Sequence, residues 1–123
     1  MNINNRVKVV IVVAVSLSMA SCSKTRLPHL KVNSPLNGQV FVAPEAVIID
    51  AVMSDPDILF GQEILVTKEN ASADVVLDFK EHKKPDEHLV KSFLTEANTS
   101  YRIIVTAFGG EGQASDTLFV KAN

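Results

Sequence analysis

This sequence of 123 residues is poor in the residue types that reinforce small extracellular domains: it has one cysteine, no tryptophan and one tyrosine. A single cysteine, Cys22, cannot form an intramolecular disulfide, so a folded domain must depend on its hydrophobic core. The sequence also lacks a run of the ~20 apolar residues that a membrane-spanning helix needs. Its uncharged run from Val9 to Ala20 has 12 residues, a length typical of the hydrophobic region of an export signal.

Basic residues are scarce as well, with 12 lysines and arginines against 14 acidic residues. Two of the basic residues and none of the acidic ones lie in the first 22 positions, so the rest of the chain has a net charge of −4. A nucleic-acid-binding protein needs a basic surface to neutralise phosphates, and so does a protein that docks electrostatically on anionic lipids. We therefore expect no nucleic-acid partner, and a membrane contact only through a covalent lipid.

The N-terminal segment has the features of an exported protein in the expected order. Arg6 and Lys8 precede the apolar run and give the positive start that keeps the N-terminus in the cytoplasm. Leu17–Cys22, LSMASC, then resembles the lipobox of bacterial lipoproteins, although methionine stands where leucine is usual. The resemblance implies that residues 1–21 are a removable lipoprotein signal peptide. It also implies that the Cys22 thiol takes a diacylglyceryl group, which further fatty acyl chains such as palmitate accompany.

Residues 22–28 are then the lipidated cysteine and a short polar tether. Several acyl chains are needed because one chain alone binds membranes only marginally. Ser23, in place of an aspartate after the cysteine, implies release to the outer membrane of the cell envelope. Two alternatives stay open. The ordinary signal peptidase could cleave after Ala20 or Ser21 and leave a soluble protein with a free thiol, or the apolar run could be a short buried helix of a cytosolic protein.

From residue 29 to residue 123, short runs rich in valine, isoleucine and phenylalanine alternate with turn-forming residues, and no segment keeps a helical period. This pattern predicts one all-β domain built as an antiparallel sandwich. The turn signals that we expect between strands include Asp-Pro-Asp at 55–57 and Lys-Pro-Asp at 84–86. The expected strands are Leu30–Asn33, Gln39–Val42, Ala46–Met53, Glu63–Lys68, Asp74–Lys80, His88–Leu94, Tyr101–Phe108 and Asp116–Lys121.

Two stretches resemble bacterial immunoglobulin-like domains. The turn Ser34–Gly38 (SPLNG) and the following Ala46–Asp57 are similar to their opening strands, and Tyr101–Gln113 is similar to their penultimate strand and hairpin. The resemblance implies an antiparallel immunoglobulin-like sandwich of about seven to eight strands, as in small lipoproteins made of one such domain. It implies that Tyr101 forms a tyrosine corner, with its hydroxyl bonded to backbone near Glu96–Thr99; a plain half-buried tyrosine is the alternative. Function stays open, because this sandwich hosts many roles.

Few residues suggest chemistry. An enzyme is not expected, because the chain has no Gly-x-Ser-x-Gly motif and no cysteine besides the acylated one. His82 and His88 are weak candidates for a transition-metal site, but neighbouring lysines would repel a cation and a solvated loop is favoured. Asp55 and Asp57 resemble an acidic calcium-binding loop. The resemblance expects another aspartate where this chain has Gly109, so a structural turn is favoured, and we expect no metal or other cofactor.

The last prediction concerns partners. Phe60, next to Gly61, is the candidate exposed ring, and the lack of tryptophan disfavours carbohydrate binding. We predict a non-catalytic binding or accessory module that contacts another envelope protein. The alternatives are a structural spacer or assembly subunit that pairs through a sheet edge, and a periplasmic metal-binding protein. An exposed concave or aromatic patch would favour the first prediction, a long open edge strand the second, and a close approach of His82 to His88 the third.

Overall fold

The computed structural model describes residues 25–71 and 74–123, so Cys22 and the predicted signal peptide lie outside the described residues. The described part is all-β, as predicted, and holds no helix long and apolar enough to cross a membrane. Its strands are β1 (His29–Ser34), β2 (Val40–Phe41), β3 (Ala46–Lys68), β4 (Asp74–Leu94), β5 (Thr99–Gly109) and β6 (Gly112–Ala122).

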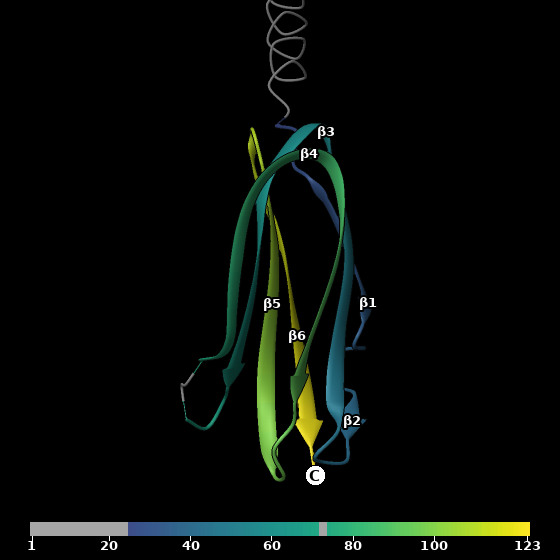
Figure 1. Cartoon of the computed structure of the whole chain (residues 1–123), viewed down its shortest axis with the longest axis vertical. Coiled ribbons are helices and arrows are strands. Elements are labelled where there is room, and N and C mark those ends of the chain that lie inside the picture. Colours follow the sequence, from purple (N-terminus) through teal and green to yellow (C-terminus); the bar gives the residue numbers. More distant parts are fainter. Residues whose placement is uncertain (1–24, 72–73) are drawn as a thin grey trace, which may run out of the picture.

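Two of these strands are unusually long, with 23 residues in β3 and 21 in β4. Each arches over one end of the molecule, so that its two halves run down opposite sides (Figure 1). The arch is possible because the pairing of β3 with β4 contains a wide bulge, in which residues 55–58 lie opposite the single residue Pro85. A bulge bends a strand without ending it. The prediction that the Asp-Pro-Asp and Lys-Pro-Asp signals separate strands is therefore wrong, and the eight expected strands become six.

The strands form one curled sheet of order β1-β3-β5-β6-β2, with β4 paired to β3 beside this path. The first half of β3 pairs with β1 and with the second half of β4, while its second half pairs with β5 and with the first half of β4. These pairs are antiparallel, as is β5–β6. The pair β2–β6 is parallel, so the sheet is mixed, and the prediction of a wholly antiparallel sheet is wrong at β2.

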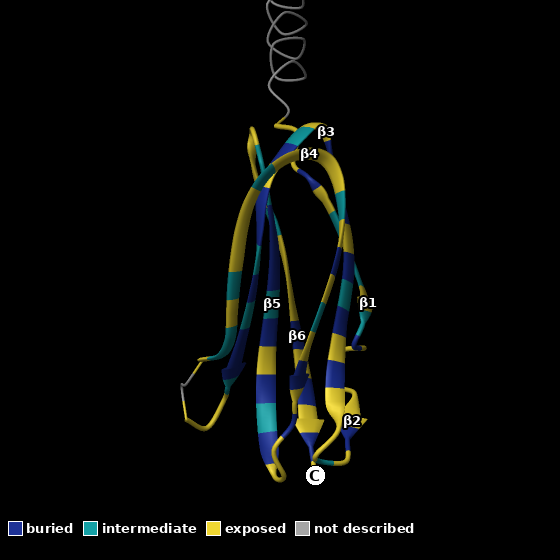
Figure 2. Ribbon diagram, viewed as in Figure 1, coloured by how far each residue is buried: buried dark blue, intermediate teal, exposed yellow. Residues whose placement is uncertain are grey.

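The hydrophobic core lies inside the curl, where β3, β5 and the end of β6 contribute most of the buried residues (Figure 2). Val47 and Ile49 on β3 and Ile103 and Val105 on β5 are fully buried, as the period of two in a half-buried strand requires. The rings of Phe93 and Tyr101 lie 5.1 Å apart between centroids, although their strands β4 and β5 are not paired. The two halves of the curled sheet therefore face each other across one core.

Candidate functional site

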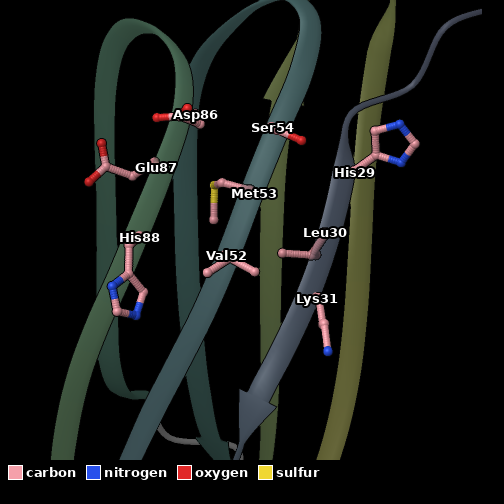
Figure 3. Close-up of a pocket in the computed structure, with 9 residues that line it drawn as sticks. All are labelled: His29, Leu30, Lys31, Val52, Met53, Ser54, Asp86, Glu87 and His88. Atoms are coloured by element: carbon pink, nitrogen blue, oxygen red, sulfur yellow. The ribbon is translucent and has the colours of Figure 1, made fainter.

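A hollow of about 550 Å³ lies over β1, the first half of β3 and the second half of β4 (Figure 3). Val52 and Leu30 lie between His88 on β4 and His29 on β1, so the two imidazoles are at opposite sides of the hollow. The hollow is lined by positively charged, negatively charged and apolar side chains. These are His29, Leu30, Lys31, Val52, Met53, Ser54, Asp86, Glu87 and His88. The polar side chains of this set do not point toward one common position (Figure 3).

His88 instead interacts with Asp50 on the neighbouring strand. The Nε2 atom of His88 lies 2.9 Å from Asp50 Oδ1, and Asn33 Nδ2 donates to the same oxygen at 3.2 Å. The hydrogen bond from His88, followed by that from Asn33, lowers the pKa of the Asp50 carboxyl from its ordinary value of 3.8. The Asp50 side chain is partly exposed and that of His88 is exposed, so this is a surface interaction that orients the imidazole.

We expect this interaction to give a small acid-sensitive contribution to stability. Because the pKa of Asp50 is lower in the folded than in the unfolded protein, the contribution is present above 3.8 and is lost as pH falls through the folded pKa. Carbon-13 NMR should show the Asp50 carboxyl titrating below 3.8, and His88→Gln should move this pKa back up. Asp50→Asn should flatten the acid limb of the unfolding free energy, and an unchanged limb would contradict the assignment.

His82 has a different partner on the other half of β3. Its Nε2 atom lies 2.9 Å from Gln62 Oε1, while its Nδ1 atom is buried without a hydrogen-bond partner. His82 and His88 thus engage separate groups on the two sides of the arch. No group of three histidine, cysteine, aspartate or glutamate side chains within the described ranges is placed to hold a metal ion. The metal-binding alternative therefore gains no support from the geometry.

The sequence favours a structural turn at Asp55, whereas the structure places this residue in the bulge within β3. Asp55 is 8% exposed, and its Oδ1 atom accepts the backbone N–H of Asp57 at 2.9 Å and that of Ile58 at 3.2 Å. Its Oδ2 atom is buried without a hydrogen-bond partner and lies against Gly109. Asp57 is exposed. The carboxylate of Asp55 thus holds the backbone of the bulge, and the position where the resemblance expects another aspartate has no space for a side chain.

Tyr101 is fully buried, and its hydroxyl accepts the backbone N–H of Glu96 at 2.7 Å. Glu96 lies in the connection between β4 and β5, within the range that the tyrosine-corner hypothesis names. Its carboxylate also pairs with Lys68 Nζ at 2.6 Å, and this hydrogen bond raises the pKa of Lys68. Both the backbone and the side chain of Glu96 are therefore tied to β3 or β5, which fixes this connection over the end of the core.

Phe60 lies at the arch and is 42% exposed. Sequence reasoning missed a larger apolar surface, on the outer face of the second half of β3 and its neighbours. Leu77 on β4 lies opposite Leu65 on β3, which in turn lies opposite Ile104 on β5. Phe79 and Phe119 extend this surface along and across the strands and are 52% and 44% exposed. The signal was in the sequence, because these residues alternate with the core residues of the same strands.

We define this apolar face as Leu65, Leu77, Phe79, Ile104, Phe108 and Phe119. At one end it borders a hollow of about 390 Å³, in which Thr67, Arg102 and Asp74 lie beside Leu65 and Phe119. Glu63 on β3 lies directly opposite Phe79, so the face also contains a charged side chain. Scattered exposed apolar residues are ordinary, whereas apolar patches rimmed by polar residues mark interaction surfaces.

No protein-family model matches the chain, and no curated protein matches it. Among solved structures, the chain is similar to the crystal structure of an engineered protein, with a TM-score of 0.50 and 18% sequence identity over 78% of this chain. The match covers 20% of that protein, so this chain corresponds to about a fifth of its length. At this identity the likeness concerns the fold alone.

Proposed function

We propose that the chain is a lipid-anchored lipoprotein of the bacterial cell envelope, held at the outer membrane through acyl chains on Cys22. In this proposal its domain is an immunoglobulin-like sandwich that acts as a non-catalytic binding module for another envelope protein. The observation that carries the binding role is the apolar face, where Leu77, Phe79 and Phe119 are between 44% and 63% exposed. Burying such side chains in an interface is favourable by about 25 cal/mol per Å² of apolar surface.

The strand pairings support the immunoglobulin-like part of the proposal. Each half of β3 and of β4 can be counted as a strand of its own, which gives eight segments in two facing groups. One group is β1 with the first half of β3 and the second half of β4; the other is the remaining halves with β5, β6 and β2. Two facing groups around one core are the arrangement of a sandwich.

Anchoring is tested on the full chain made in bacterial cells. Mass spectrometry of the purified mature protein should find an acylated N-terminal Cys22. Cys22→Ala should leave the chain unprocessed or released from the membrane fraction, because the thiol that takes the lipid is gone. Cys22→Ser is the matched variant that keeps size and polarity, and it should behave like the alanine variant. A wild-type mature chain without lipid would refute the anchoring proposal.

The binding role is tested by site-specific photo-crosslinking in the same cells. A photoreactive residue at Phe119, on the apolar face, should give a discrete product of defined mass that contains a second protein. The same residue at Lys31, an exposed polar position on β1 at the opposite half of the sheet, is the control and should give no such product. Equal crosslinking from both positions would show that the apolar face is not a preferred contact surface.

A second function is favoured by a separate observation, the open edge of β4. This strand pairs with β3 on one side only, among the residues that the structure describes. An open edge is what an assembly subunit needs in order to extend its sheet into another chain.

A further inference from the structure

The first half of β4 is a regular strand edge that nothing in the described part of the chain covers. Its pairing with β3 is uninterrupted from Val76, opposite Val66, to Glu81, opposite Gly61. The register shifts lie outside this stretch, and the proline of the strand, Pro85, lies beyond it in the arch. Bulges, prolines and charged side chains are the usual means by which a protein protects an edge from pairing, and of these the stretch has only the charges of Asp78, Lys80 and Glu81. Residues 76–81 therefore present free backbone groups in the geometry of a ladder.

The side chains beside this edge are apolar on the outer face. Leu77 is 63% exposed and Phe79 is 52% exposed. The Phe79 ring is held from one side by Phe108 in an edge-on contact, with 5.7 Å between centroids and 71° between planes. A strand added at the edge would bring its own side chains next to Leu77 and Phe79.

The charges along this segment make it complementary to itself. Asp74 and Asp78 precede Phe79, while Lys80, Lys83 and Lys84 follow it, with Glu81 as the one exception. Two copies of such a strand repel in parallel and attract in antiparallel orientation, because acidic and basic halves then lie opposite each other. Opposite charges at directly facing positions of two strands stabilise the pair, and like charges at these positions destabilise it.

The charge pattern also selects one register. In a symmetric antiparallel pair centred on Phe79, Asp78 of each copy lies opposite Lys80 of the other. Centring the pair on Asp78 or on Lys80 would place two identical charges face to face. Centring it on Leu77 would place Asp78 opposite Val76, with no charge compensation. Only the register on Phe79 brings two aromatic rings together and pairs opposite charges on both sides of them.

We propose that two copies of the chain associate through the edge of β4, antiparallel and with Phe79 of one copy opposite Phe79 of the other. Such a pair has a two-fold axis and buries the same surface on both copies, as in most homodimers. It joins two curled sheets into one continuous sheet and unites the two apolar faces. The internal ion pair of Asp78 with Lys91, 3.1 Å, uses Oδ2 of the carboxylate. Within residues 25–71 and 74–123, Oδ1 has no ion-pair partner, and in the proposed pair it would accept Lys80 of the second copy.

The register is tested by disulfide crosslinking of the full chain in the cells that produce it. Phe79→Cys places two thiols at facing positions, where Cα atoms lie ~4.5–5.5 Å apart, within the ~4.4–6.8 Å that a disulfide spans. Mild oxidation should give a product of twice the chain mass that reductant reverses. Phe119→Cys and the wild type, whose one cysteine is Cys22, are the controls and should give several-fold less. Equal yields from Phe79→Cys and Phe119→Cys would overturn the proposal.

A second pair of variants keeps Phe79 in place. In the proposed register Leu77 lies opposite Glu81 of the second copy. Leu77→Cys and Glu81→Cys chains with different tags should therefore form a mixed disulfide when they are produced together, and neither should crosslink to itself to the same extent. Self-crosslinking of both variants at the level of the mixed product would show random collision and refute the register.

Charge variants test the same pair without relying on the folding of any single variant. In the Phe79→Cys background, Lys80→Asp places Asp78 opposite an aspartate, and Asp78→Lys places a lysine opposite Lys80, so each should lose most of the dimer. Producing the two together restores both attractive pairs and should restore a mixed dimer. Crosslinking of Lys80→Asp at the original level, or failure of the mixture to recover, would overturn the proposal. The proposed function is tested by acylation of Cys22 and by photo-crosslinking at Phe119, and neither measurement depends on the disulfide dimer. The proposed function and the proposed dimer can therefore each fail alone.

Discussion

Replacing Tyr101 with alanine should destabilise the protein by about 3–5 kcal/mol, the usual cost of removing a buried aromatic side chain. The Tyr101 ring is fully buried and packs against Phe93, with 5.1 Å between ring centroids. Because these two residues come from the two facing halves of the curled sheet, the cavity left by alanine would open at their junction. Chemical denaturation followed by circular dichroism measures the loss.

Tyr101→Phe isolates the hydroxyl group. It keeps the ring and leaves the Glu96 N–H, which the hydroxyl accepts at 2.7 Å, without its partner, so we expect a cost of about 1–3 kcal/mol. Phe60→Ala is the comparison at a 42% exposed ring, where the expected change is about 0.5 kcal/mol or less. If Tyr101→Phe is as stable as the wild type, the hydrogen bond to Glu96 does not anchor the connection, and the immunoglobulin-like proposal loses its best local support.

The all-β class and most strand positions could be predicted from the sequence, because strand alternation is a local signal. The period of two in residues 101–108 and 116–121 follows directly from which side chains the core accepts, such as Ile103, Val105 and Leu118. The joining of strands at the arch could not be predicted. Asp-Pro-Asp is a turn signal by itself, and only the partner strand decides whether the chain turns there or continues through a bulge.

The parallel pairing of β2 was hidden for a similar reason. Consecutive strands usually lie side by side, but β1 and β2 lie at opposite ends of the strand order. Backbone hydrogen bonds to the C-terminal residues hold β2 beside β6. Lys121 N–H donates to Gln39 O at 3.1 Å, and Asn123 N–H donates to Phe41 O at 2.9 Å. Such contacts join residues about eighty positions apart, and no local pattern in the sequence encodes them.

In the candidate site, too, contacts between residues close in the sequence could be predicted, and contacts between different strands could not. The sequence could indicate that Asp55 belongs to a structural turn, since aspartate commonly accepts the backbone N–H two residues ahead. It could not indicate that His82 and His88 would take Gln62 and Asp50 as partners. These contacts depend on the register between β3 and β4. The apolar face was missed because Leu77 and Phe79 were assigned to a strand without knowing which face would be covered.

Gly109→Ala should produce the second large effect, because a side chain at this position would overlap with the buried carboxylate of Asp55. A Cβ atom there meets Oδ2 of Asp55 first and lies 3.3 Å from Pro28 Cδ. Asp55 cannot withdraw freely, since its other oxygen holds the backbone N–H groups of Asp57 and Ile58. Overpacking of this kind costs about 1–3 kcal/mol.

The adjacent glycine provides a matched control. A Cβ atom at Gly110 meets only the Phe60 ring, at 3.3 Å, and that ring is exposed enough to move aside. Gly110→Ala should therefore change the unfolding free energy by less than Gly109→Ala. Combining Gly109→Ala with Asp55→Ala tests the cause, because removing the carboxylate removes the overlap, and residues in direct contact show coupling of about 0.5–3 kcal/mol. If the two changes add without coupling, Gly109 is not held small by Asp55, and the bulge of β3 must be supported by other contacts.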